Sequence, residues 1–302
     1  MRAAICQGDL QKFLLNYMQL NKKHLPLSQN RLGYANKFAK TIKPRKLKGI
    51  QMLNESELKA LQDIESKYYM QPMFEAIRAD LADEKITLQS CFNHLYDYLI
   101  NSRQKVENLI QARIAKGEIK DASQARKSIA GGAFSSLIMW VFLQNKDKGN
   151  VAQNVFITSK ISQIPHYKEL FFIQVGEETQ KPDVDLVIYS LDSTNALKNC
   201  LILSLKTSLR ERAGQTYKWK LLMEIANTDS AIKEKYDIAY NPPILPLVCF
   251  ATVNFYDEIN NPQHRGMFKF FDCAFIGKNI QTSEFIKPLS YLIDYVRKNV
   301  SA

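Results

Sequence analysis

Residues 181–212 read KPDVDLVIYSLDSTNALKNCLILSLKTSLRER, and this stretch decides the fold. Two apolar runs with β-branched members, 184–189 and 201–205, are separated by a polar turn region. Such runs predict neighbouring strands that are buried on both faces. Asp183 stands at the start of the first strand and Lys206 at the end of the second. The stretch therefore predicts a carboxylate and a lysine at the ends of adjacent strands.

This pairing of charges suggests a chemical role. A carboxylate can hold a hard divalent cation, which lowers the pKa of a bound water, and a lysine can offset charge on an attacked phosphate. Ser204 and Lys206 leave their strand on one face, because strand side chains alternate. The pattern predicts metal-assisted phosphodiester hydrolysis. The alternative is that Asp183 is a strand-entry residue and Lys206 a solvated strand end.

Pro182-Asp183, followed at hairpin distance by Ser204-Leu205-Lys206, resembles the PD-(D/E)xK nuclease signature in its SxK variant. The continuation through Arg210-Glu211-Arg212 resembles type II restriction endonucleases that cut before CCGG or CCNGG, the group around SsoII, AgeI, BsaWI and EcoRII. The resemblance covers about residues 121–280. It implies a restriction-endonuclease-like α/β fold, a mixed sheet flanked by helices in αβββαβ order.

The resemblance also implies roles for individual residues. Asp183 would bind Mg²⁺, the Leu205 carbonyl could approach the metal, and Ser204 would bond a metal-bound water. Lys206 would position or activate the attacking water. Cutting a palindrome on both strands needs two active sites related by two-fold symmetry, hence a homodimer on double-stranded DNA. A cognate DNA methyltransferase is expected in the host.

A second metal-binding carboxylate is harder to place. Related enzymes often carry a glutamate after a phenylalanine in the helix before the sheet, but here Phe134 is followed by two serines. SxK relatives commonly carry the acid in the helix after the lysine, at positions where this chain has Trp219 and Lys220. Glu224 is the next acid and the first candidate. Asp185, on the same strand face as Asp183, is the other. A site with one strong acid stays open as well.

The segment Arg210-Glu211-Arg212 suits base recognition in the major groove. Arginine can bond G O6 and N7 bidentately, and a carboxylate can accept a hydrogen bond from cytosine N4. We interpret the segment as a reader of C·G pairs. The alternative is an exposed helix start with internal ion pairs, which stabilise little.

The net charge of +11 is concentrated near the start of the chain, where residues 21–49 contain nine basic residues and no acid. Such a block, which includes Lys43, Arg45 and Lys46, predicts contacts with nucleic-acid phosphate. A solvated basic loop is the ordinary alternative. An anionic membrane surface is a third partner, but the block lacks a bulky apolar face.

Apolar spacing predicts the remaining elements. Helices are expected at 10–18, from Asn54 to Pro72 with a capping box to Glu57, and at 74–81, 87–115 and from Asp121 to about residue 141. Strands are expected at 170–175, beside the strand of Asp183, and at 245–255 and 267–276, joined by a loop at 260–265. A last helix is expected at 283–298. We therefore expect a helical region at 1–118, with the basic loop 21–49, and a nuclease core at 119–302.

Other features narrow the class of protein. Five scattered cysteines without a CxxC pair and four dispersed histidines favour neither a disulfide framework nor a zinc site. No apolar run reaches the roughly 18 residues of a membrane span, and no secretory signal opens the sequence, so we expect a cytoplasmic protein. The sequence predicts a type II restriction endonuclease. Alternatives are a repair or recombination nuclease without sequence preference and a catalytically silent DNA-binding protein.

Overall fold

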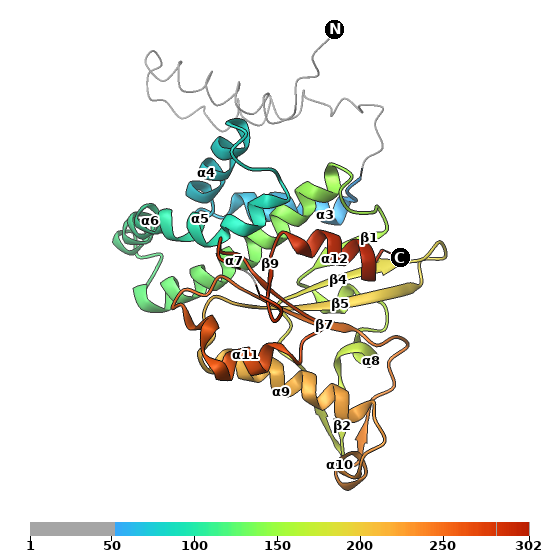
Figure 1. Cartoon of the computed structure of the whole chain (residues 1–302). Helices are drawn as coiled ribbons and strands as arrows, with labels where there is room; N and C mark the ends of the chain where they lie inside the picture. The colour runs from blue at the N-terminus through green and yellow to red at the C-terminus, as the bar shows by residue number, and fades with distance from the viewer. Residues whose placement is uncertain (1–51, 282, 302) are drawn as a thin grey trace, which may run out of the picture. The chain divides into compact units, whose positions relative to one another are not determined.

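The computed structural model describes residues 52–281 and 283–301, which fold around a six-stranded mixed sheet (Figure 1). The strand order is β1-β4-β5-β7-β8-β9. The first three strands are antiparallel neighbours, whereas β5, β7, β8 and β9 run parallel. The strands are β1 (Val155–Thr158), β4 (Leu186–Leu191), β5 (Leu197–Lys206), β7 (Leu247–Thr252), β8 (Cys273–Ile276) and β9 (Lys287–Pro288).

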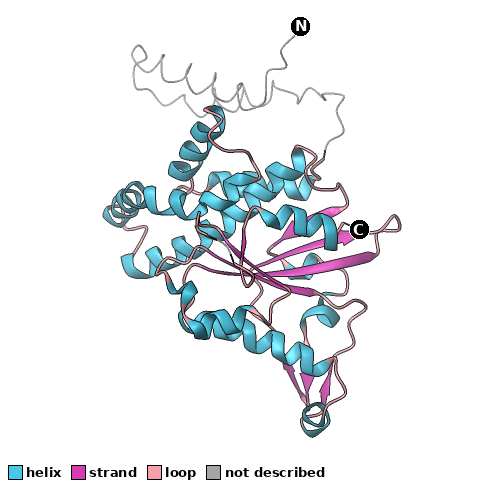
Figure 2. Cartoon of the chain, viewed as in Figure 1, coloured by secondary structure: helices cyan, strands magenta, loops and turns pink. Residues whose placement is uncertain are grey.

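The expected αβββαβ order is confirmed. It consists of helix α7 (Ala122–Asp147), the strands β1, β4 and β5, helix α9 (Arg210–Ala226) and strand β7. Figure 2 shows helices on both faces of the sheet. The fold is thus a mixed α/β sheet flanked by helices, with further helices preceding α7.

Strand β5 is buried on both faces, as expected from its continuous apolar run. Leu201, Leu203 and Leu205 pack in a core with α7 and the helices before it. Cys200 and Ile202 pack in a second core with α9 and with residues of α8 (Tyr167–Phe171) and α11 (Pro262–Phe268). The two cores fix β5 between two helical layers, and so fix the position of Lys206 at its end.

The first strand of the sheet is β1, and the prediction that residues 170–175 pair with the strand of Asp183 is wrong. Leu170 and Phe171 belong to α8, and the next residues form β2 (Ile173–Val175). That strand pairs with β3 (Glu178–Gln180) and β6 (Ile238–Ala239) in a separate small sheet. The unbroken apolar run 170–173 has no periodicity, so helix and strand could not be told apart from it.

The helices before α7 begin with a confirmed capping box. In front of α3 (Glu55–Ser66), the Glu57 N–H donates to Asn54 Oδ1 at 2.8 Å and the Asn54 N–H donates to Glu57 Oε2 at 3.0 Å. Asp121 likewise caps α7, accepting from the Gln124 N–H. Helix α4 spans Gln71–Ala82. Residues 1–51, which include the expected helix at 10–18 and the basic loop, lie outside the described residues.

The long helix expected at 87–115 is divided into three pieces. They are η2 (Ser90–His94), α5 (Leu95–Asn101) and α6 (Arg103–Ala115). At the first joint the Tyr96 N–H donates to the Gly277 carbonyl at 2.8 Å instead of to its own helix. A bond to a residue so distant in sequence could not be read from helical spacing. Gly117, with φ +73°, follows the last piece as expected.

Close packing explains one of the two glycines inside α7. A Cβ on Gly132 would lie 3.2 Å from the Tyr69 hydroxyl, whereas one on Gly131 would meet no atom within 4 Å. Gly132 thus lets the α7 backbone approach the segment between α3 and α4.

The C-terminal part also differs from expectation. The loop expected at 260–265 is mostly helix α11, capped by Asn261 and started by Pro262 at a position where proline is tolerated. The expected last helix begins later, as α12 (Tyr291–Asn299), because Pro288 lies in β9 and cannot donate a helical hydrogen bond. The remaining elements are η3 (Ile161–Gln163), α10 (Ala231–Lys235) and η4 (Glu258–Asn260). None of the helices in the described part of the chain is long and apolar enough to cross a membrane.

Candidate active site

Asp183, Asp185 and Lys206 meet where β4 begins and β5 ends, and we call these three residues the edge cluster. Lys206 Nζ lies 3.0 Å from Asp185 Oδ2 and 3.4 Å from Asp183 Oδ2. The lysine side chain is only 6% exposed, whereas that of Asp183 is 73% exposed. A buried ammonium is thus held between two carboxylates, one of which is open to solvent.

The β4–β5 register explains this meeting. The strands are antiparallel and Leu186 pairs with Leu203, so the residues before Leu186 approach the last residues of β5. Asp185 Oδ2 also accepts the Leu205 N–H at 2.7 Å. The Asp185 carboxylate therefore adds a hydrogen bond to the β4–β5 ladder beyond the Leu186–Leu203 pair. Its two donors, the Leu205 N–H and Lys206 Nζ, fix its orientation. Asp183 has one looser contact, so it can turn toward a ligand at lower cost.

Ser204 lies on the same face of β5 as Lys206, but it contacts a helix and not the two acids. Its Oγ is 2.8 Å from Thr216 Oγ1 of α9, and both residues are buried. This bond ties the end of β5 to α9.

Glu224 is not brought to the edge cluster. It lies beyond Thr216 on α9, about 12 Å further along the helix axis. Its Oε1 is 2.6 Å from Lys220 Nζ, and the same amine is 3.0 Å from Asp272 Oδ2. We call Lys220, Glu224 and Asp272 the distal cluster.

The distal cluster lies toward the opposite end of the sheet. Asp272 Oδ2 accepts the Val248 N–H at 2.7 Å near the start of β7, whereas Lys206 pairs with Thr252 at its end. The two positions are about 13 Å apart along the strand. Burial of Lys220 lowers its pKa, but bonds and charges from both acids outweigh burial, so the pKa is raised above its ordinary value.

The donors of the edge cluster suit a magnesium ion. Asp183 and Asp185 provide two carboxylates next to the Leu205 backbone, and these hard oxygen donors match the preference of Mg²⁺. That ion commonly keeps several waters and uses one or two carboxylates together with substrate phosphate. Within residues 52–281 and 283–301, no three or more His, Cys, Asp or Glu side chains are grouped so that they could hold a metal. Any metal here would thus have few protein ligands.

The segment Arg210-Glu211-Arg212 forms the first turn of α9, shortly after Lys206. The side chains of this segment are outside what the structure describes, as are Lys43, Arg45 and Lys46. The backbone just before the turn is held firmly. The Leu209 N–H donates to Glu258 Oε2 at 2.9 Å, and the Phe255 N–H donates to the Thr207 carbonyl at 3.0 Å.

The loop after β7 provides these contacts, and sequence reasoning missed it. Asn254 is buried at φ +50°, a left-handed conformation that asparagine tolerates better than most residues. Its N–H donates to Thr252 Oγ1 at 2.9 Å, and its Oδ1 accepts the Glu258 N–H at 2.8 Å. The available signal was an asparagine inside the apolar run 245–255, where strand was expected throughout. We call Asn254 and Glu258 the brace of α9.

Two comparisons show which known proteins this chain resembles. Residues 163–295 match the family model described as BsaWI restriction endonuclease type 2. The chain is also 28% identical over 153 residues to the Methanocaldococcus jannaschii protein named "Putative type II restriction enzyme MjaVIP". That alignment covers 47% of this chain and 66% of the relative's length. The resemblance to type II restriction endonucleases is confirmed, and residues 163–295 contain the edge cluster and α9.

Proposed function

We propose that this protein is a type II restriction endonuclease that cuts both strands of DNA by Mg²⁺-dependent phosphodiester hydrolysis. The recognised site would be a short palindrome with a CCGG- or CCNGG-like core. The observation that carries the proposal is the edge cluster, in which Lys206 lies between Asp183 and Asp185 just before α9. The matches to type II restriction endonucleases support the same reaction class.

A bound Mg²⁺ would supply a water of lowered pKa and stabilise charge on the attacked phosphate. Asp185 would hold the ion in a fixed direction, because Leu205 and Lys206 already orient its carboxylate. Exposed Asp183 would complete the pair of carboxylates, with the Leu205 carbonyl as a further oxygen ligand. Ser204 would act indirectly, by holding the end of β5 against Thr216.

Lys206 would bind the phosphate or orient the attacking water. Its Nζ donates to Asp183 and Asp185, so these two contacts hold the side chain in place. An incoming phosphate offers a third anionic partner. The ammonium would then contact a phosphate oxygen or the attacking water, at the point where negative charge increases during the reaction.

Site selection would come from the first turn of α9. Arg210, Glu211 and Arg212 have the donor and acceptor groups that distinguish C·G pairs in the major groove. The brace holds Leu209, directly before that turn, and so would keep the recognition segment close to Lys206. A palindrome read in this way requires a homodimer on DNA. We expect a cytoplasmic enzyme whose host carries the cognate DNA methyltransferase.

The test is to incubate the purified protein with unmethylated phage DNA and Mg²⁺ and to sequence the fragment ends. We expect discrete ends that share a C/G-containing core and that disappear with Lys206→Ala. Lys198→Ala is the matched control, because Lys198 is an exposed lysine toward the other end of the same strand.

Two outcomes would contradict the proposal. Ends without a shared sequence would indicate a nuclease of repair or recombination. Intact DNA across several divalent metals, with binding retained, would indicate a DNA-binding protein that does not cleave.

A further inference from the structure

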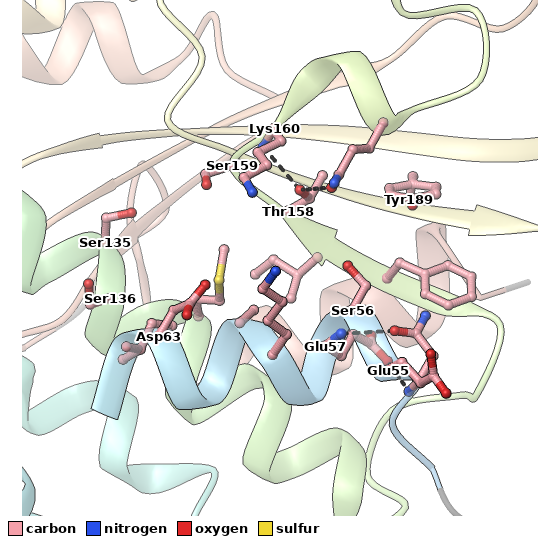
Figure 3. A pocket seen from close by; sticks show the side chains of 18 of the residues that line it. Glu55, Ser56, Glu57, Asp63, Ser135, Ser136, Thr158, Ser159, Lys160 and Tyr189 are labelled. Carbon is pink, nitrogen blue, oxygen red and sulfur yellow. Dashed lines mark hydrogen bonds between the residues drawn. The ribbon is translucent and has the colours of Figure 1, made fainter. Parts of the chain in front are cut away.

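A cavity of about 760 Å³ lies between α3, α7 and the edge strand β1 (Figure 3). One wall is a face of α3, and the others come from α7 and from the C-terminal end of β1. Figure 3 shows Ser135 and Ser136 toward one end of this pocket and Glu55 and Tyr189 toward the other. The lining is largely polar, with several hydroxyl groups and three lysines, Lys59, Lys67 and Lys160.

One part of this pocket lies beside the edge cluster. Thr158, which lines the pocket, pairs with Val187 in the β1–β4 ladder, two residues after Asp185. Neighbouring strands are about 4.8 Å apart. Thr158 therefore lies about one strand spacing from Val187. Ser159 and Lys160, which also line the pocket, follow β1 in a bend where the Lys160 N–H donates to Thr158 Oγ1 at 3.0 Å.

Lys67 brings a half-buried positive charge to the same pocket. Its Nζ donates to Ser136 Oγ at 2.8 Å, and within the described chain no carboxylate lies within ion-pairing distance of it. Burial lowers the pKa of Lys67, although the nearby charge of Asp63 opposes this shift. An ammonium removed from water with only a neutral partner is costly, so an anion bound next to it would be favourable.

The charges of the pocket are unevenly distributed. Glu57 is neutralised by buried Lys146 at 2.7 Å, so it does not counter the lysines of the lining. Glu55 lies toward the end away from Ser135. Asp63 is the acid that most directly opposes an anion near Lys67. The end away from Glu55, where Lys67 bonds Ser136, is thus the part that best suits an anion.

We propose that Lys67 and Lys160 bind backbone phosphates of the DNA strand that passes through the active site. The hydroxyls of Ser135 and Ser159 would be additional donors. This inference rests on the proposed function, which brings the scissile phosphate to Asp185. Phosphates follow one another every 3.4 Å of helix rise along each strand, so neighbours of that phosphate would pass the pocket. Lysine and hydroxyl groups are the usual donors to the DNA backbone.

Binding measurements without divalent metal test this site independently of cleavage. The affinity for a cognate duplex is measured over a series of NaCl concentrations for the wild type, Lys67→Met and Lys160→Met. We expect each variant to bind about tenfold more weakly, as for the loss of one charge-assisted hydrogen bond. The slope of log K against log salt should fall by about 1 in each. Lys198→Met, the matched control, should behave like the wild type.

Asp63→Asn should change the DNA affinity in the opposite direction. Removing this exposed carboxylate should tighten binding, which a purely structural role of the pocket would not predict. Lys67→Arg keeps the positive charge and should restore most of the affinity that Lys67→Met loses. If Lys67→Met fails to fold, as judged by thermal melting, the exposed residues Lys160 and Asp63 decide the question.

Wild-type affinity and slope in folded Lys67→Met and Lys160→Met would overturn the phosphate site. In that case normal cleavage at discrete sites would leave the proposed function intact. Conversely, reduced slopes in a protein that cuts no DNA would support the phosphate site while contradicting the proposed function.

Discussion

The edge cluster and the distal cluster have nearly the same local chemistry. Each holds a buried lysine amine between two carboxylates, and in each one acid also accepts a backbone N–H at 2.7 Å. In each, the second acid is more than half exposed. A lysine between two acids is therefore not by itself sufficient to identify an active site.

The clusters differ in what surrounds them. The edge cluster lies where β5 ends, and β5 and β7 are parallel there. Ligands of open α/β sheets bind outside the carboxyl ends of such strands. Beside it lie the braced start of α9 and the pocket of Lys67. The distal cluster instead joins the later part of α9 to the start of β7. Position in the fold therefore distinguishes the candidate site from the distal cluster, whereas local chemistry does not.

The largest expected effect comes from replacing the lysine of each cluster, which tests whether the two clusters have different roles. Lys206→Ala should lower the cleavage rate by at least about 100-fold, as for loss of a group that stabilises transition-state charge. Lys220→Ala should instead remove the buried amine that bonds Glu224 and Asp272, and lower the free energy of unfolding by roughly 1–3 kcal/mol. Cleavage rates per folded molecule and urea unfolding measure the two effects. Equal loss of cleavage in both variants would remove the distinction.

A second prediction separates the two acids of the edge cluster. Asp183→Asn should raise the Mg²⁺ concentration needed for half-maximal cleavage and leave the melting temperature unchanged, because Asp183 is mostly exposed. Asp185→Ala should also lower the free energy of unfolding by about 1–3 kcal/mol, since it leaves the Leu205 N–H without its acceptor. Magnesium titrations and thermal melts check this. An unchanged metal requirement in both variants would exclude them as metal ligands.

The brace of α9 gives a third, smaller effect. Glu258→Ala removes the acceptor of the Leu209 N–H, which should cost about 1 kcal/mol, the usual cost of losing a helix cap. A looser first turn should discriminate less between sites, so cleavage at sites with one mismatch should rise relative to the cognate site. Glu258→Gln keeps an acceptor oxygen and is the matched control. If Glu258→Ala is less stable but still discriminates between cognate and mismatched sites as the wild type does, the brace contributes only to stability.

The smallest effect concerns the distal cluster at high pH. The folded pKa of Lys220 is raised above its ordinary value of 10.5. Its stabilising contribution is therefore complete below that value and is lost as pH rises through the folded pKa. Urea unfolding of the wild type and Lys220→Met should differ at pH 9 and converge above pH 10.5. If the two free energies of unfolding differ by the same amount at every pH in this range, the charge of Lys220 does not stabilise the fold.

The sequence alone determined the central hairpin and the candidate residues at its end. Residues 186–191 and 197–206 form strands because their apolar side chains suit burial on both faces. Their antiparallel pairing then brings Asp183 and Asp185 to Lys206. The starts of α3 and α7 were equally predictable, since capping depends on residues three positions apart.

Tertiary structure alone decided how these parts meet. That Glu224 lies with Lys220 and not with Lys206 follows from the direction of α9 across the sheet, which is set by packing between distant residues. The Tyr96–Gly277 bond, the brace of α9 and the lining of the Lys67 pocket also join segments far apart in sequence. Local periodicity carries no information about such contacts. The sequence therefore identified the candidate groups, whereas the fold determined which of them lie together.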